Sequence, residues 1–224
     1  MKKLICFSLW GSDKKYLHGA LENAELSSKF YPEWTCRYYI SRDNTPKNIC
    51  NKLESYDNCE IVWNDQLNSQ SQRIFRFAPL CDSDVDYFIV RDLDSRVGQR
   101  EVAAVDQWIQ SGADYHLMRD NVEHGIVMMA GMWGSKGNLL PDFYELLEDH
   151  EKNMGDAFHV ITQVDQVFLK NYVVPTIQSA LVHDETTHIG GSPYPVSRED
   201  GQIPNFIGES FEDFVYGGID YKEY

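Results

Sequence analysis

The stretch DYFIVRDLDS, residues 86–95, decides how the rest of the chain is interpreted. A short apolar run is followed at once by two aspartates, Asp92 and Asp94, with an arginine on each side of the pair. In open α/β sheets, ligands bind beyond the carboxyl ends of the strands. Two carboxylates one residue apart at such an end can converge on one hard cation and leave positions free for a ligand's phosphates. The stretch therefore predicts a site at the end of a buried strand.

Length and charge limit the kinds of partner. The 224 residues suit one domain of ordinary core size, and 42% of them are hydrophobic. A formal net charge of -15 repels phosphate backbones, so no nucleic acid partner is expected. The apolar runs are too short for a membrane span, and we interpret the opening MKKLICFSLWGSD as a first strand rather than a signal peptide.

The five cysteines indicate a cytoplasmic location. They are odd in number, lie in the first half of the chain and show no CxxC spacing. Reduced thiols are the default for such a set, and Cys6, inside an apolar run, is expected in the core rather than in catalysis.

Short apolar runs alternate with helical patterns, which is typical of strands joined by helices in a largely parallel sheet. The segment 41–48, SRDNTPKN, is rich in turn residues. Helical spacing is expected around 17–24, 70–78, 102–109, 143–147 and 161–172. Strands are expected at 4–9, 35–40, 61–63, 87–90, 115–118, 127–133 and 180–182.

Two arginines, Arg73 and Arg76, lie on one face of the helix that leads into the 86–95 stretch. Guanidinium groups suit phosphate oxygens, so a diphosphate could be held between a cation and these side chains. The alternative is that the arginines pair with the carboxylates in a structural network. For the aspartates, the alternative is that Asp94 caps a turn while Asp92 is solvated.

In this arrangement the chain resembles the nucleotide-sugar glycosyltransferases of the GT-A fold, and more loosely the retaining family that includes glycogenin. The resemblance runs from Leu4 to about His183. It rests on the order of these motifs: YLHGA after the first strand, the arginine-bearing helix, DYFIVRDLDS as the DxD strand, MMAGMWG, VDQVFL and ALVHD.

The resemblance implies an α/β single-domain GT-A fold, with a mixed, mostly parallel central sheet flanked by helices. Residues 1–98 would form a Rossmann-like nucleotide-binding half, 99–185 an acceptor-side half and 186–224 a C-terminal extension or flap. The implied activity is transfer of a hexosyl group, with retention, from a UDP-sugar donor to a hydroxyl of a glycan or small-molecule acceptor.

The resemblance also implies roles for individual residues. Asp92, Asp94 and His183 would bind Mn²⁺ or Mg²⁺. Ser8, Leu9 and Trp10 would form the base pocket and Tyr16 would stack on the base. Arg73, Arg76 and Leu93 would complete the nucleotide-sugar site, with Asp94 and Arg76 acting in catalysis.

The sequence departs from the glycogenin-like pattern at three places, the first of which is a longer segment after the first strand. The acceptor-side strand carries Ala130-Gly131 where an asparagine-glycine pair is expected, and the segment after the last strand reads HDETTHIGG. His188 is therefore an alternative to His183 as a metal ligand.

Asp165 is the candidate for a catalytic carboxylate near the anomeric carbon. Its spacing from Ile161 and Phe168 sets it at the edge of a buried helical face, while Gln166 is expected to point away. The alternative for Asp165 is a helix-edge carboxylate paired with a neighbour. Asp120 and His124 are candidates for an acceptor cleft.

Two other functions stay open at this point. A haloacid-dehalogenase-like phosphatase also uses a strand-borne DxD, although its fold normally opens with that strand. A non-catalytic nucleotide- or sugar-binding module would keep the cleft without turnover. Trp133 and the methionines Met128, Met129 and Met132 are expected to pack in the core.

Overall fold

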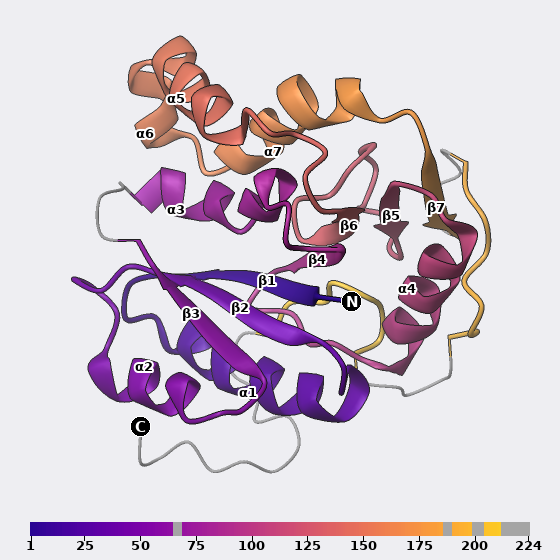
Figure 1. The fold of residues 1–224 in the computed structure, drawn as a ribbon, viewed down its shortest axis with the longest axis horizontal. Coiled ribbons are helices and arrows are strands. Elements are labelled where there is room, and N and C mark those ends of the chain that lie inside the picture. Colours follow the sequence, from indigo (N-terminus) through magenta and orange to yellow (C-terminus); the bar gives the residue numbers. More distant parts are fainter. Residues whose placement is uncertain (65–68, 186–189, 199–203, 212–224) are drawn as a thin grey trace.

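The computed structural model describes residues 1–64, 69–185, 190–198 and 204–211 of the chain. In these residues the strands form one seven-stranded sheet with the order β3-β2-β1-β4-β6-β5-β7 (Figure 1). The elements up to the DxD strand are β1 (Lys3–Leu9), α1 (Lys14–Phe30), β2 (Thr35–Ile40), α2 (Lys47–Glu54), β3 (Cys59–Trp63), α3 (Ser69–Phe75), a 3₁₀ turn (Ala78–Cys81) and β4 (Tyr87–Arg91).

The second half of the chain completes the sheet and adds helices to both of its faces. Its strands are β5 (Tyr115–Arg119), β6 (Met132–Lys136) and β7 (Ala180–Asp184). Its helices are α4 (Gln99–Ser111), α5 (Phe143–Met154), α6 (Asp156–Val160) and α7 (Val164–Phe168), the last continued by π-type turns (Leu169–Val173) and a 3₁₀ turn (Val174–Thr176).

The sheet is mixed but mostly parallel. Strand β1 pairs in parallel with both β2 and β4, β2 with β3, and β5 with β7. Only β6, among the described strands, runs antiparallel to its neighbours, β4 and β5. From β1 the chain adds β2 and β3 on one side of the sheet and then crosses to add β4 on the other side. The point between β1 and β4 is therefore the switch point of the sheet, where open α/β sheets place their ligands.

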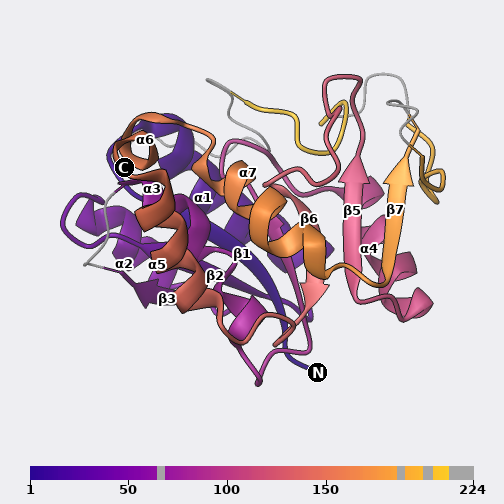
Figure 2. The same cartoon turned by 90° about the horizontal axis from the view of Figure 1, so that it is seen from above.

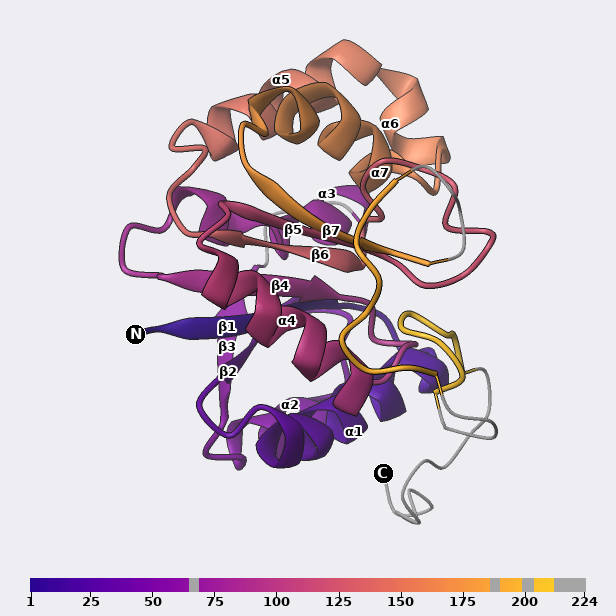
Figure 3. The same ribbon diagram turned by 90° about the vertical axis from the view of Figure 1, so that its right-hand side faces the viewer.

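Helices cover both faces of the sheet. Helices α1, α2 and α4 lie on one face, and α3, α5, α6 and α7 lie on the other (Figures 1 and 3). Figure 2, seen from the second side, shows α5 to α7 in front of the strands. Strand β1 alternates accordingly, with Leu4 and Cys6 in one core cluster and Ile5, Phe7 and Leu9 in the other. Burial on both faces explains why this strand reads as an unbroken apolar run.

One strand begins later than its sequence suggests. The apolar residues 127–133 predict a strand, but β6 begins at Met132 and the segment before it is irregular. The side chain of Gln166 takes the hydrogen bonds of Ala130 N and Met128 O that a ladder would otherwise use. Side-chain hydrogen bonds therefore replace sheet pairing in this segment.

Two helical segments also differ from expectation. The turn-rich segment 41–48 leads directly into α2, which the sequence pattern missed and which buries Ile49, Cys50 and Leu53. Ile161 does not share the buried face of the later helix, because α7 begins only at Val164 and Ile161 is exposed. None of the helices in the described residues combines the length and the apolar character needed to cross a bilayer.

Candidate active site

A pocket of about 510 Å³ opens where β1 and β4 end, at the switch point of the sheet. This volume falls within the range of small-molecule and cofactor sites. It is lined by residues from α1, α3, α7 and the loops after β1, β4 and β5, namely Ser8, Trp10, Gly11, Ser12, Asp13, Tyr16, Arg73, Arg76, Asp92, Leu93, Asp94, His124, Met129, Ala130, Gly131, Met132, Thr162, Asp165, Gln166 and Gly208.

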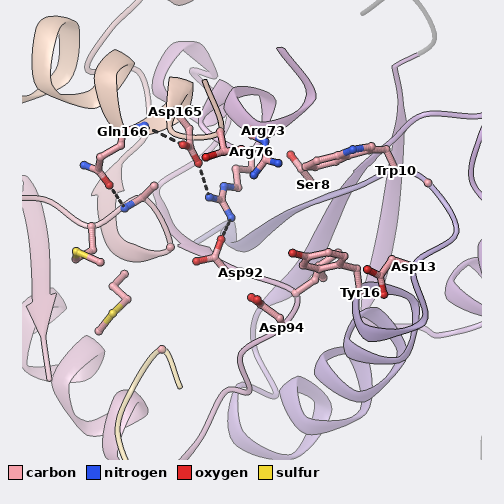
Figure 4. Close-up of a pocket in the computed structure, with 18 of the residues that line it drawn as sticks. Ser8, Trp10, Asp13, Tyr16, Arg73, Arg76, Asp92, Asp94, Asp165 and Gln166 are labelled. Carbon is pink, nitrogen blue, oxygen red and sulfur yellow. Dashed lines mark hydrogen bonds and ion pairs between the residues drawn. The ribbon is translucent and has the colours of Figure 1, made fainter. Parts of the chain in front are cut away.

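One end of the pocket is aromatic and polar. Trp10 follows β1, and the guanidinium of Arg73 lies 5.2 Å from the centroid of its ring. Tyr16 lies in the first turn of α1, whose N-cap Asp13 accepts a hydrogen bond from Lys15 N at 3.0 Å. Figure 4 shows Ser8, Trp10, Asp13 and Tyr16 on the same side of the pocket. The hydroxyl of Ser8 and Nε of Arg73 are buried and have no hydrogen-bond partner in the described part of the chain.

Arg76 connects three groups at the centre of the pocket. Its Nη1 donates to the Arg91 carbonyl at 3.0 Å and also to Asp92, while Nη2 donates to Asp165 Oδ2 at 3.0 Å (Figure 4). Burial alone would lower the pKa of Arg76, but Asp92 and Asp165 together raise it. The guanidinium therefore stays charged and joins the DxD loop to α7.

Asp165 is a buried residue of α7, although Ile161, one of the two residues from which its spacing is counted, lies outside that helix. It lies in the first turn of α7 and is 8% exposed. Burial raises the pKa of its carboxyl above the ordinary value, although Arg76 opposes that effect. Asp165 pairs with Arg76, as expected if its role is structural. Arg76 itself lines the pocket, however. Structural and catalytic roles are therefore compatible for this side chain.

The second aspartate of the DxD pair is held from two sides. Lys15 Nζ lies 3.1 Å from Asp94 Oδ2, and the hydroxyl of Ser210 donates to the same oxygen at 3.0 Å. The main chain of Phe211 also donates to the Asp94 carbonyl at 2.8 Å. The described C-terminal segment 204–211 therefore packs against the DxD loop, and its Gly208 lines the pocket.

Gln166 is a pocket residue that the sequence pattern misplaced. It was expected to point away, but its side chain lines the pocket. Its Oε1 accepts from Ala130 N at 3.0 Å (Figure 4). Its Nε2 donates to the Met128 carbonyl. Helical spacing could not indicate this, because the partner is an irregular loop far away in the sequence.

The pocket collects most of the residues that the sequence singled out. Those that line it are Ser8, Trp10, Tyr16, Arg73, Arg76, Asp92, Leu93, Asp94, His124 and Asp165. Leu9 does not belong to this set, because it points into the core with Ile5 and Phe7 and is 1% exposed. Asp120 does not line the pocket either, because its carboxylate is fully buried against Arg100, Arg198 and Ile207 N.

The structure places His183 away from the two DxD aspartates, which corrects its expected role as their metal-binding partner. It is fully buried at the end of β7 and is not part of the pocket lining. Its Nδ1 is hydrogen-bonded to His116 Nε2 at 2.8 Å and its Nε2 to Gln107 Oε1 at 2.9 Å. Both ring nitrogens are thus engaged. The alternative ligand, His188, lies outside the described residues.

No group of three or more His, Cys, Asp or Glu side chains in the described residues is arranged to hold a metal ion. The pocket offers two carboxylates, Asp92 and Asp94, and the side chain of Asp92 is 46% exposed. A pair of carboxylates suits a Mg²⁺-like ion that takes its remaining oxygens from water and substrate phosphates. The donor set therefore fits such an ion but not a cage made by the protein alone.

The fold is that of known proteins, although the sequence is not close to any of them. No family model and no curated protein matches the sequence. Among solved structures, Staphylococcus aureus TarS 1-349 in complex with UDP matches with a TM-score of 0.53 and 15% identity, over 83% of this chain and 59% of that chain. The glycosyltransferase GlyE of Streptococcus pneumoniae TIGR4 matches with a TM-score of 0.51 and 12% identity, over 82% of this chain and 45% of that one.

A nucleotidyltransferase also has an architecture similar to that of this chain. The 4-diphosphocytidyl-2C-methyl-D-erythritol synthase of Anaerococcus prevotii DSM 20548 matches with a TM-score of 0.50 and 11% identity, over 82% of this chain and 89% of that chain. Together the matches show that the chain has the α/β GT-A fold shared by nucleotide-sugar transferases and nucleotidyltransferases. This assignment removes the basis of the haloacid-dehalogenase alternative, whose DxD strand opens the fold, whereas here the DxD follows β4.

Proposed function

We propose that this chain is a metal-dependent glycosyltransferase that transfers a hexosyl group from a UDP-sugar to a hydroxyl of a glycan or other small acceptor. The observation that carries the proposal is one pocket that combines an aromatic end, two arginines and both DxD aspartates at the switch point of a GT-A sheet. Each part meets a need of a nucleotide diphosphate sugar, namely stacking for the base and positive charge for the diphosphate.

The donor is proposed to lie along the pocket from Trp10 to Asp165. The base would stack at Trp10 and Tyr16, with the unpartnered hydroxyl of Ser8 available to hydrogen-bond it. Arg73 makes no hydrogen bond or ion pair within the described part of the chain, so its guanidinium is available for a phosphate. The diphosphate would then lie beside Arg73 and Arg76.

Charge balance supports a divalent cation. The acidic and basic lining residues apart from His124 are two arginines and four aspartates, Asp13, Asp92, Asp94 and Asp165, so a diphosphate would enter a pocket that already carries excess negative charge. Asp92 and Asp94 would hold Mn²⁺ or Mg²⁺ together with phosphate oxygens. Such an ion supplies Lewis-acid stabilisation of the charge that develops on the leaving nucleotide.

The chain's own residues have separate roles in the proposed step. The bond between the sugar C1 and the diphosphate oxygen breaks, and its electron pair stays on the nucleotide, where Arg76 and Arg73 stabilise it. Asp165, which accepts a hydrogen bond from Arg76 Nη2, would stabilise the positive charge that develops at C1. Following the resemblance to the glycogenin-like family, we propose that the anomeric configuration is retained.

All five cysteines are free, which supports a cytoplasmic setting.

A thermal-shift assay with UDP, with and without Mn²⁺, tests the proposal together with hydrolysis of UDP-, GDP- and dTDP-sugars. We expect stabilisation by UDP that requires Mn²⁺, and slow hydrolysis of one UDP-sugar. In Asp94→Asn both should fall, hydrolysis by about 100-fold or more. Asp149→Asn, on the exposed face of α5, is the matched control.

The rival functions give different results in the same assay. Stabilisation by UDP without hydrolysis or transfer would indicate a binding module rather than an enzyme. Release of phosphate from simple phosphomonoesters would indicate a phosphatase. Equal behaviour of the wild type and Asp94→Asn would remove the DxD pair from the proposed site.

A further inference from the structure

The end of the pocket opposite Trp10 and Tyr16 is apolar. Met129, Ala130, Gly131, Met132 and Gly208 line it. In Figure 4, sulfur atoms lie on the opposite side of Asp92 from the labelled Trp10 and Tyr16. The charged groups of the pocket therefore separate a polar aromatic end from an apolar end.

The apolar end is the outer surface of a small hydrophobic cluster. Met132 packs with Met118, Tyr194 and Ile207 in a cluster separate from the two main core clusters, and Met129 packs against it. Gly208 lies so close to Met132 that a Cβ at this glycine would meet its sulfur at 2.5 Å. Met132 is therefore closely packed by this cluster and by Gly208 on one side, and it lines the pocket on the other.

The loop that carries Met129 also has an apolar rim. On this loop, Val122 is 74% exposed, Ile126 41% and Val127 51%. Single exposed aliphatic side chains are ordinary on a protein surface. Three of them lie on the one loop that leads to Met129 in the pocket lining, and a concentration of exposed apolar side chains beside a pocket is typical of contact sites.

The same loop is fixed to the reaction centre. Gln166 hydrogen-bonds the loop on both sides of Met129, accepting from Ala130 N at 3.0 Å and donating to the Met128 carbonyl. Its neighbour Asp165 pairs with Arg76 at 3.0 Å. Two adjacent residues of α7 thus set the position of the apolar wall relative to the charged centre.

One polar group faces this end from the loop. His124 lines the pocket, and its Nδ1 accepts the backbone N–H of Asp120 at 3.2 Å. Burial lowers the pKa of His124, so the neutral ring carries its proton on Nε2. The ring can therefore donate one hydrogen bond to a hydroxyl oxygen.

From this arrangement we infer that the acceptor carries an aryl or alkyl group beside its reacting hydroxyl, and that this group docks on Met129, Met132 and the Val127 side of the loop. The inference rests on the proposed function and names its acceptor class. In the transfer, the acceptor oxygen bonds to the sugar C1 as the bond from C1 to the diphosphate breaks, and the acceptor proton leaves with the nucleotide or to solvent.

A fully hydroxylated acceptor suits this end less well. Each hydroxyl that leaves water without a new partner costs free energy. Besides the carboxylate of Asp92, which lies against Gly131, the side chains at this end of the described structure that can exchange hydrogen bonds are His124 and Thr162. The oxygen and the nitrogen of the Gln166 amide are both engaged with the loop. An aryl or alkyl group needs no such partners and gains from contact with the methionines.

Matched pairs of acceptors test the inference by binding rather than by turnover. Methyl and 4-nitrophenyl glycosides of glucose, galactose and N-acetylglucosamine are titrated by ligand-observed NMR, with and without UDP and Mn²⁺. We expect the 4-nitrophenyl member of at least one pair to bind about tenfold more tightly than its methyl partner. Its aryl protons should receive the strongest saturation transfer from the protein.

Two variants locate the docking surface. Met129→Gln keeps the length of the side chain and adds polarity, and Val127→Gln changes a half-exposed side chain outside the hydrophobic core clusters. Both should reduce the aryl preference several-fold, and Val127→Gln, which lies outside the pocket lining, should leave hydrolysis of the donor unchanged. Val160→Gln, on α6 and outside the pocket lining, is the control and should keep the preference.

Equal affinities within every pair, no detectable binding of any aryl member at millimolar concentration, or an aryl preference that persists in both variants would each overturn the inference. The proposed function fails separately, through absence of UDP binding or donor hydrolysis in the wild type. The titrations without UDP decide the acceptor inference even in that case.

Discussion

The carboxylate of Asp92 lies against the main chain at position 131. A Cβ added to Gly131 would lie 1.9 Å from Asp92 Oδ2, closer than any two such atoms can approach. Because the obstacle is the free end of a half-exposed side chain, the carboxylate rather than the fold would have to move. A glycine at position 131, where the glycogenin-like pattern also has one, thus controls the direction in which Asp92 points.

Gly131→Ala is therefore expected to separate activity from stability. The displaced carboxylate loses its place beside Arg76, so donor hydrolysis should fall by about 100-fold. The melting temperature should change little, since no core group is disturbed. Gly125→Ala, in the same loop with nothing within 4 Å of its added Cβ, is the control in both assays. A rate of donor hydrolysis in Gly131→Ala equal to that of the wild type would show that the position of the Asp92 carboxylate does not matter for the reaction.

At the scale of elements, α1 and the DxD loop are packed in direct backbone contact. Gly19 lies inside α1, and a Cβ there would be 1.7 Å from the Leu93 carbonyl oxygen. Asn23, one turn further along α1, donates to the Ser95 carbonyl at 2.8 Å, and its own oxygen accepts from Val97 N at 3.1 Å. The loop that carries both aspartates is thus shaped by α1.

Gly19→Ala is expected to lower stability as well as activity, in contrast to Gly131→Ala. The clash is with main chain, so the helix or the loop must shift, at a cost of about 1–3 kcal/mol. Urea denaturation of the variant measures this cost. Gly98→Ala, whose added Cβ makes only an ordinary contact at 3.5 Å, should remain near the wild type. Unchanged stability in Gly19→Ala would contradict the packing described between α1 and the loop.

Helix α7 serves both halves of the pocket, and Gln166→Glu tests the half that faces the acceptor. A carboxylate keeps the acceptor for Ala130 N but places a negative charge against the Met128 carbonyl. We expect the KM for an aryl glycoside acceptor to rise about tenfold while the KM for the donor stays constant. Gln163→Glu, an exposed substitution in the turn before α7, is the matched control. An equal rise in both KM values would assign Gln166 a general structural role.

At the scale of the whole molecule, the second half of the sheet contains a buried histidine pair whose ionisation opposes folding. Burial and then the nearby Arg100 lower the pKa of His183 from 6.5 to about 4, with Glu185 opposing, and burial also lowers that of its partner His116. Above pH 6.5 these rings are neutral in both states. As the pH falls from 6.5 toward about 4, the unfolded chain takes up protons first, so stability is lost across that window.

Melting curves between pH 7 and 4 check this expectation. The wild type should lose on the order of 5 °C from the histidine pair, beyond the loss caused by other groups. His183→Gln should lose less over the same range, although it starts from a lower value because its hydrogen bonds change. His159→Gln, an exposed substitution, should follow the wild type. Parallel curves for wild type and His183→Gln would exclude the pair as the cause.

The sequence predicts the parts of this molecule that depend on local pattern. Buried strands such as Leu4 to Leu9, and the acidic pair after β4, are visible as apolar runs and charge changes. The order of the motifs carries the resemblance that implies the GT-A fold, and the sequence singled out ten of the twenty residues that line the pocket.

What the sequence could not supply depends on contacts between distant segments. Gln166 turns toward the pocket because an irregular loop offers it two backbone partners, and His183 turns inward because His116 and Gln107 take both of its nitrogens. Leu9 and Ser8 are neighbours in one strand, yet pleating sends one into the core and the other to the pocket. Contacts between distant segments decide the orientations of Gln166 and His183, whereas the alternation of Ser8 and Leu9 follows from the local strand pattern.

A crystal structure of the chain with UDP and Mn²⁺ tests the central claim most directly. The account expects the uracil ring beside Trp10 and Tyr16, the diphosphate beside Arg73, and the ion between the phosphates and the carboxylates of Asp92 and Asp94. A nucleotide bound elsewhere, or bound in this pocket while both aspartates keep their pairs with Arg76 and Lys15 and touch no ion, would contradict it.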